Sequence, residues 1–106
     1  MSGNFDTFRV DYQYVAKSQA AAKLTGQGGK GMIGDIIENI LVIPLTASPG
    51  QVTLQDGNGA AMVIFQGGAN AGINPVPLHF SCKSVLGAFT VVTGDNVALF
   101  VQGRFQ

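Results

Sequence analysis

Residues 51–66 have the sequence QVTLQDGNGAAMVIFQ, and this stretch decides the fold class. On each side of its centre, apolar residues such as Val52, Leu54, Val63 and Phe65 alternate with other residues, as in strands that bury one face. The centre, residues 56–59, is Asp-Gly-Asn-Gly, and both dipeptides tolerate the positive φ that a tight turn needs. The pattern predicts a β-hairpin.

The same alternation of short apolar segments with Gly, Pro, Asn and Asp extends from Asp35 to the C-terminal residue. The apolar segments are Ile36–Leu45, Gln51–Gln55, Ala60–Gln66, Val76–Cys82, Ala88–Thr93 and Asn96–Phe105. Their connections are short and contain no crossover helix, so we expect antiparallel neighbours. The sequence therefore predicts a small all-β antiparallel sandwich of about seven to eight strands, of jelly-roll or Greek-key type.

Two of these segments carry more specific expectations. In Ile36–Leu45 the isoleucines are compatible with helical spacing, but the β-branched run 40–43 leads directly into Pro44 and favours a buried strand. The final two segments are expected to pair as a second hairpin through Gly94-Asp95. Residues from both could then form one buried face, namely Phe89, Val91, Val97, Leu99 and Val101.

The first third of the chain has a different texture. Residues 8–15 alternate apolar and polar side chains, which predicts a strand or an extended arm. The Ala-rich stretch Ser18–Lys23 is compatible with a helical turn, and Gly26–Gly34 is expected to be a flexible, glycine-rich loop. We therefore divide the single domain into an N-terminal arm and loop, residues 1–34, and a sandwich core, residues 35–106.

The composition indicates a domain that associates with other molecules. Of 106 residues, only 11% are charged and 46% are hydrophobic. Six basic and six acidic residues give a net charge of zero, and neutrality promotes association. We expect a subunit of a homo-oligomer or of a larger assembly.

The distribution of residue types disfavours several partners. Lys and Arg are scattered, which argues against nucleic acid. The longest apolar stretch contains Glu38 and is too short to span a bilayer, and residues 1–6 lack the apolar region of a signal peptide. A single cysteine, Cys82, excludes an internal disulfide and fits a reducing compartment. We expect a protein made in a cytoplasm, without nucleic-acid or membrane partners.

No set of residues has the spacing of a catalytic, cofactor-binding or metal-binding site. Residues 26–31, Gly-Gln-Gly-Gly-Lys-Gly, match G-x-G-x-x-G, but no βαβ unit surrounds them. His79 is expected on the face opposite Leu78 and Phe80, and Cys82 on the other face, so the two do not form a nucleophile–base pair. The acidic residues are spread over different segments, and those in turns are expected to support the backbone there. We expect no enzymatic activity, cofactor or metal.

Aromatic residues near the N-terminus are the best candidates for a binding surface. They are Phe5, Phe8, Tyr12 and Tyr14. Aromatic side chains dominate binding hot spots, so we expect these four to contact another subunit. Stacking against a sugar or a nucleotide is the alternative use of such a row.

Four stretches of the chain resemble a group of short virion proteins encoded by tailed bacteriophages. They are Asp35–Pro44, which contains Ile-Leu-Val-Ile-Pro; Ser48-Pro49-Gly50; Val52–Asp56; and Lys83–Phe105, which contains Phe-Thr-Val-Val-Thr-Gly-Asp-Asn-Val and ends in Gly-Arg-Phe. The resemblance extends from Gly31 to the end of the chain and leaves residues 1–30 outside it.

This resemblance implies a virion structural component, a capsid decoration or cement protein with a β-sandwich fold. Such proteins commonly stand as trimers on the outer capsid surface and bridge major capsid proteins. The resemblance thus implies a homotrimer, a major capsid protein as partner, and a place in the virion after synthesis in the host cytoplasm. A phage tail protein or a receptor- or carbohydrate-binding module is the alternative, because a sandwich fold serves many functions.

Overall fold

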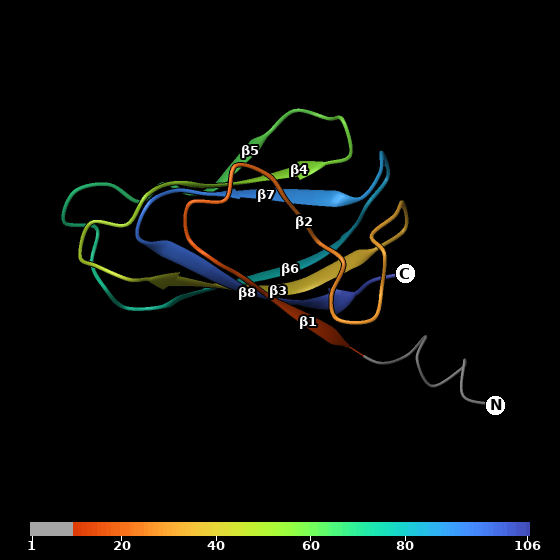
Figure 1. Cartoon of the computed structure of the whole chain (residues 1–106), viewed down its shortest axis with the longest axis horizontal. Helices are drawn as coiled ribbons and strands as arrows, with labels where there is room; N and C mark the ends of the chain where they lie inside the picture. Colours follow the sequence, from red (N-terminus) through yellow and green to blue (C-terminus); the bar gives the residue numbers. More distant parts are fainter. Residues whose placement is uncertain (1–9) are drawn as a thin grey trace.

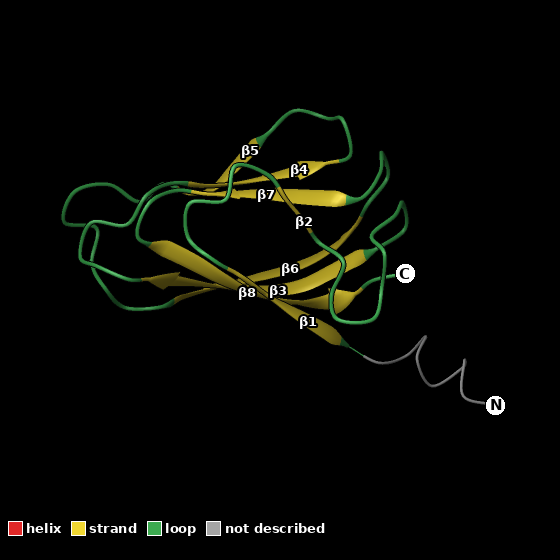
Figure 2. Cartoon of the chain, in the orientation of Figure 1, coloured by secondary structure: helices red, strands yellow, loops and turns green. Residues whose placement is uncertain are grey.

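Two four-stranded antiparallel sheets lie face to face, as the sequence predicts (Figure 1). The computed structural model of the chain describes residues 10–106, and these contain strands and loops but no helix (Figure 2). Sheet A has the strand order β1-β8-β3-β6, and sheet B the order β2-β7-β4-β5. The eight strands are β1 (Asp11–Val15), β2 (Ala22–Lys23), β3 (Ile36–Pro44), β4 (Val52–Asp56), β5 (Met62–Phe65), β6 (Val76–Lys83), β7 (Phe89–Thr93) and β8 (Val97–Arg104).

The core lies between the inner faces of the two sheets. Alternate residues of the central strands are buried there, and Leu24, from the connection after β2, joins them with no exposed surface. The buried cluster consists of Val15, Leu24, Ile37, Ile40, Val42, Val52, Leu54, Phe89, Val91, Val97, Leu99 and Val101. These residues are mostly β-branched or aromatic, which suits a pleated surface packed on one side.

The hairpin predicted for residues 51–66 is present, but the burial expected for Val63 is wrong. A register shift between Val52 and Thr53 places Val63 opposite Thr53 on the outer face of sheet B, where it is 53% exposed. β4 and β5 pair in antiparallel register, with Leu54 opposite Met62, and Gly57 in the connecting turn has φ of 54°. An added Cβ at Gly57 would lie 2.5–2.6 Å from the backbone of Leu86 and Gly87, so this turn also packs closely against the β6–β7 loop. The Asp-Gly-Asn-Gly signal therefore identified a turn that both reverses the chain and makes a tertiary contact.

The segment predicted at Ile36–Leu45 forms strand β3, Ile36–Pro44, as the β-branched run favoured, and its helix-like spacing has a structural cause. The pairing of β3 with both neighbours shifts register between Ile37 and Asn39, as at a β-bulge. The extra residue lets Ile37 and Ile40, three positions apart, both point into the core. Gly103 lies opposite the bulge, where an added Cβ would collide with the carbonyl oxygen of Ile36.

The second predicted hairpin is wrong. β7 belongs to sheet B and β8 to sheet A, so the two strands face each other across the core instead of pairing (Figure 1). The connection changes sheets at Asn96, whose φ is 64°, and Gly94 packs there against Gly50. Alternation alone predicts which side of a strand is buried. It does not distinguish a neighbour in the same sheet from a strand in the opposite one.

The first third of the described chain forms part of the sandwich. β1 pairs with β8 from Asp11 opposite Gly103 to Val15 opposite Leu99. The helical turn considered for Ser18–Lys23 is wrong, because Ser18 has φ of 60° and the segment ends in β2, paired with β7. Tertiary hydrogen bonds outweigh the local preference of the alanines: Gln19 exchanges backbone and side-chain hydrogen bonds with Thr93.

The glycine-rich loop that follows β2 is anchored at several points. Asp11 accepts hydrogen bonds from the amides of Gln27 and Gly28, at 2.8 and 3.0 Å. The backbone carbonyl of Gln106 accepts from the amides of Lys30 and Gly31. The loop runs from β2 into β3, both strands, so its G-x-G-x-x-G pattern lacks the helix that a dinucleotide site requires.

Candidate functional site

Every Asp and Glu side chain in residues 10–106 accepts a hydrogen bond that joins distant parts of the chain. Three aspartates accept from backbone amides: Asp11 from Gln27 and Gly28, Asp35 from Met32 and Gln106, and Asp56 from Val85 and Leu86. The other two acidic residues accept from side chains: Glu38 from Arg104, and Asp95 from the Ser18 hydroxyl. The described residues contain no group of three or more His, Cys, Asp or Glu side chains that could hold a metal ion. The carboxylates therefore serve as clamps between segments.

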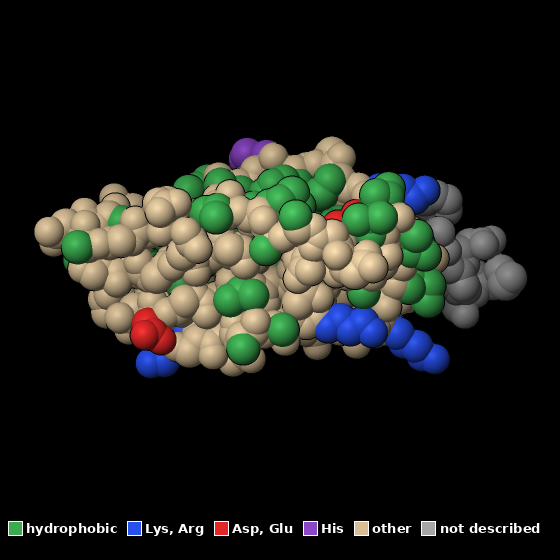
Figure 3. Space-filling view, turned by 90° about the horizontal axis from the view of Figure 1, so that it is seen from above, with side chains coloured by type: hydrophobic (Ala, Val, Ile, Leu, Met, Phe, Trp, Pro, Cys, Tyr) green, Lys and Arg blue, Asp and Glu red, His purple; other side chains and the backbone are tan. Residues whose placement is uncertain are grey.

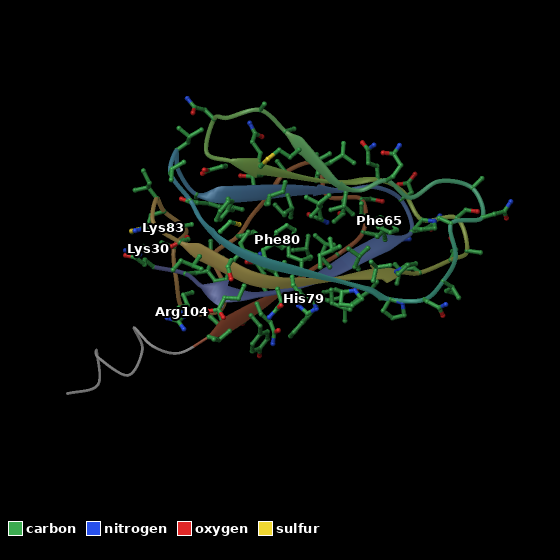
Figure 4. All side chains as sticks on the ribbon, turned by 180° about the vertical axis from the view of Figure 1, so that it is seen from behind. Lys30, Phe65, His79, Phe80, Lys83 and Arg104 are labelled. Carbon is green, nitrogen blue, oxygen red and sulfur yellow. The ribbon has the colours of Figure 1, made fainter. Side chains whose placement is uncertain are left out.

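His79 and Cys82 lie on opposite faces of β6, as the sequence predicts. His79 is exposed on the outer face of sheet A, where its Nδ1 is 2.8 Å from Asn39 Oδ1 (Figure 4). Cys82 is partly buried against the core. Burial, reinforced by the charge of Asp56, raises the pKa of the Cys82 thiol. A raised pKa disfavours the thiolate, which is the nucleophilic form.

The outer face of sheet A carries two aligned rows of side chains, and we call this surface the aromatic face. Strand register places Tyr14, Phe100, Leu41 and Pro77 side by side in an apolar row across β1, β8, β3 and β6. The next row along the strands contains Tyr12, Gln102, Asn39 and His79. The rings of Tyr12 and Phe100 stack with centroids 5.6 Å apart, and 57% of Tyr14 is exposed.

A hollow of about 370 Å³ lies in the aromatic face above β3. It is lined by Asn39, Ile40, Leu41, Pro77, Leu78, His79, Phe100 and Gln102. Side chains of β8 form one wall and side chains of β6 the other, so the hollow is a shallow groove along the strands. Most of its lining residues are apolar, which favours an apolar occupant.

Charge on the aromatic face is balanced. Arg104 Nε lies 2.9 Å from Glu38 Oε2, and this ion pair closes one end of the face. The rows of tyrosine, phenylalanine, leucine, proline and amide side chains beyond it carry no Asp, Glu, Lys or Arg. A partner that covers this surface therefore has to desolvate little unpaired charge.

A second apolar surface lies at one end of the sandwich, and we call it the loop-tip patch. It consists of Met32, Ile33, Val85 and Leu86, which are 43%, 57%, 66% and 56% exposed. In Figure 3 apolar side chains gather at the right-hand end of the molecule, with Lys or Arg side chains nearby. Connecting loops are usually polar, so four large apolar side chains on two adjacent loops are unusual.

Hydrogen bonds to two carboxylates anchor the two loops of the loop-tip patch. Asp35, fully buried, accepts from the Met32 amide at 2.9 Å, and Asp56 accepts from the amides of Val85 and Leu86 at 2.9 and 3.2 Å. The amide of Gly34 donates to the carbonyl of Ser84 and thereby joins the two loops. The patch is thus preorganised, which lowers the entropy lost when a partner binds.

Two of the four predicted binding residues fall within the described residues. Tyr12 and Tyr14 are exposed on the aromatic face, whereas Phe5 and Phe8 fall outside the described residues. Sequence reasoning missed Leu41 and Phe100, although strand alternation with the buried Leu99 places Phe100 outward. It also missed the loop-tip patch, whose sequence signal is apolar pairs within predicted connections.

Comparison of the chain with models of known protein families, with curated proteins and with solved structures finds no match. Among residues 10–106 there is no helix with the length and apolar character needed to cross a membrane. The aromatic face and the loop-tip patch are the candidate functional surfaces.

Proposed function

We propose that the chain is a non-enzymatic virion structural protein that decorates a bacteriophage capsid and stabilises it by bridging major capsid proteins. In this proposal the sandwich is of the jelly-roll or Greek-key type. The observation that carries the proposal is the pair of preorganised apolar surfaces on a net-neutral chain. The resemblance to short phage virion proteins, from Gly31 onward, supplies the identity of the partner.

Burial of these surfaces contributes favourable free energy to attachment. Tyr14 is 57% exposed, and an aromatic side chain of roughly 150–250 Å² then leaves about 100 Å² for a partner to cover. At about 25 cal/mol per Å², this one residue contributes roughly 2.5 kcal/mol when buried. A few such contacts per subunit, repeated over a symmetric shell, give high avidity without any single tight site.

The placement of the two surfaces suits a bridging role. The aromatic face lies on the outer side of sheet A, whereas the loop-tip patch lies at one end of the sandwich. One subunit can therefore contact one neighbour through its side and another through its end. A small domain with one functional surface could attach to a shell but could not link two of its components.

The details of the aromatic face favour a protein partner over a glycan. A sugar requires an open aromatic ring and free hydrogen-bonding groups, but the ring of Tyr12 is stacked on Phe100. Asn39 and His79 are hydrogen-bonded to each other. Apart from the hydroxyl of Tyr14, the apolar row beside them offers area without side-chain hydrogen-bonding groups, as in the centre of a protein interface.

Co-sedimentation with capsids that lack the protein tests the proposal. We expect the wild-type chain to sediment with such capsids, and a Val85→Ser, Leu86→Ser variant to bind at least tenfold more weakly. The matched control is Val63→Ser, which removes a side chain of similar exposure, 53%, from the outer face of sheet B. Failure of the wild type to bind would refute the proposal, and equal binding of both variants would refute the role of the loop tips.

A further inference from the structure

We propose that the aromatic face binds a second copy of this chain, with the two faces packed across a two-fold axis parallel to the strands. The axis passes between β8 and β3, the two central strands of sheet A. This inference goes beyond decoration of a capsid and holds for the isolated protein; on a capsid, a dimer whose aromatic faces cover each other would attach through the loop-tip patch of each copy and so still link two positions on the shell. It follows from the order of the strands and from which side chains the register aligns.

The strand order makes the face self-complementary. Rotation about this axis places β1 over β6 of the second copy, and β8 over its β3. Within the apolar row, Tyr14 then meets Pro77 of the second copy, and Phe100 meets Leu41 of the second copy. Apolar side chains lie against apolar side chains on both sides of the axis, as an isologous interface requires.

The groove above β3 receives one side chain from the second copy. It lies between walls formed by β8 and β6, directly over Leu41. The rotation brings Phe100 of the second copy over Leu41, so this ring enters the groove. Symmetry repeats the insertion, and each copy contributes one ring and one groove. An aromatic ring in a pocket at the centre of an interface is a typical hot spot.

The polar row is also matched. His79 Nδ1 lies 2.8 Å from Asn39 Oδ1, and the other ring nitrogen, Nε2, points away from this contact and can make a hydrogen bond with the second copy. Tyr12 of the second copy lies opposite this ring and has a hydroxyl to donate. Gln102 lies opposite Asn39 of the second copy, and two amide side chains can exchange hydrogen bonds.

Charge complementarity fixes the direction of the packing. Glu38 is on β3 and Arg104 on β8, and they form an ion pair within one copy. The rotation places Arg104 of each copy over Glu38 of the other copy. Each of the four charges therefore has an opposite charge beside it in its own copy and another across the interface. An axis perpendicular to the strands would instead reverse their direction and carry the Glu38–Arg104 pairs of the two copies to opposite ends of the interface, where neither charge meets an opposite charge.

The area of the face indicates a weak dimer. Four strands spaced at about 4.8 Å and the stretch from Ala98 to Arg104, at about 3.3 Å per residue, give a footprint of roughly 400 Å² per copy. Stable interfaces bury about 800 Å² per partner, so we expect a dissociation constant on the order of 100 µM. Such a contact is populated where copies are concentrated.

Sedimentation-velocity centrifugation of the full chain, from about 10 µM to about 1 mM, tests the inference. We expect a concentration-dependent monomer–dimer equilibrium. Tyr14→Ser should weaken it tenfold or more, whereas Val63→Ser, on the outer face of sheet B, should leave it unchanged. Monomer throughout, a trimer, or a dimer insensitive to Tyr14→Ser would each overturn the inference.

A charge-exchange pair tests the geometry. Glu38→Arg and Arg104→Glu should each abolish the dimer, because each variant places like charges opposite one another. An equimolar mixture should recover a dimer, and failure to recover it would overturn the two-fold packing. Capsid co-sedimentation is measured separately, so a monomeric protein that still binds capsids would refute this inference and leave the proposed function standing.

Discussion

Replacement of Asp35 by Asn removes the clamp that joins the start of β3 to both the loop-tip patch and the C-terminus. Asp35 is fully buried, and its two carboxylate oxygens accept from the amides of Gln106, at 2.8 Å, and Met32, at 2.9 Å. An asparagine of the same shape keeps one acceptor and presents an NH₂ group to the other amide. One of the two partly buried amides then loses its acceptor.

The size of the effect follows from that single loss. A hydrogen bond to a charged group contributes about 1.5–3 kcal/mol, and an unsatisfied buried donor costs about 1–3 kcal/mol. The neutral amide is easier to bury than the carboxylate, which offsets part of this. We expect Asp35→Asn to lower the free energy of unfolding by about 2 kcal/mol, a large part of the roughly 5–15 kcal/mol available to a domain.

Urea denaturation followed by circular dichroism measures this loss, with Asp95→Asn as the matched control. Asp95 is exposed and accepts from the Ser18 hydroxyl at 2.7 Å, so the same chemical change there should alter stability by no more than about 0.5 kcal/mol. Hydrogen exchange should also show faster exchange of the Met32 and Gln106 amides in Asp35→Asn. If both variants unfold at the same urea concentration, Asp35 is not a clamp and the reasoning is wrong.

Two further predictions concern the core and the thiol. Gly103→Ala should lower the free energy of unfolding by about 3 kcal/mol. The new Cβ would lie 3.1 Å from the Cα of Ile37 and closer still to the backbone carbonyl oxygen of Ile36. Gly28→Ala, whose Cβ meets only Asp11 Oδ2 at 4.0 Å, is the control; equal thermal midpoints would contradict the close-approach argument. Cys82 should react slowly with iodoacetamide, because burial raises the pKa of its thiol. The folded state then holds this proton to higher pH than the unfolded chain, so stability is unaffected below the usual thiol pKa and falls as pH rises above it. The loss of stability at high pH should be smaller in Cys82→Ala than in the wild type. Identical pH profiles of the two proteins would contradict the raised pKa of Cys82.

Local signals predicted much of the fold. The hairpin at residues 56–59, the strand before Pro44 and the burial of alternate residues in β7 and β8 all depend on neighbouring residues, and all are present. The pairing of β7 with β8 was wrong because Phe89 and Leu99 alternate in the same way whether their strands are adjacent or face each other. The bulge in β3 was likewise hidden, since it appears in the sequence only as helix-compatible spacing.

The candidate surfaces were less accessible to prediction because they depend on contacts between distant residues. Tyr12 and Tyr14 were chosen as aromatic residues in an alternating segment, but their neighbours on the aromatic face come from β3, β6 and β8. Asp35 is buried through an amide 71 positions away, Gln106, and no local pattern marks it. The loop-tip patch exists because such carboxylates hold apolar loops in place.

The number of copies of this chain per virion tests the central claim most directly. If the chain is a phage decoration protein, as proposed, quantitative mass spectrometry of purified virions that contain it gives this number relative to the major capsid protein. A decoration protein repeated over the symmetric shell should be present in hundreds of copies, in a fixed ratio to the capsid subunit. Absence from the virion, or a copy number matching only the few positions of a tail or neck, would contradict the account.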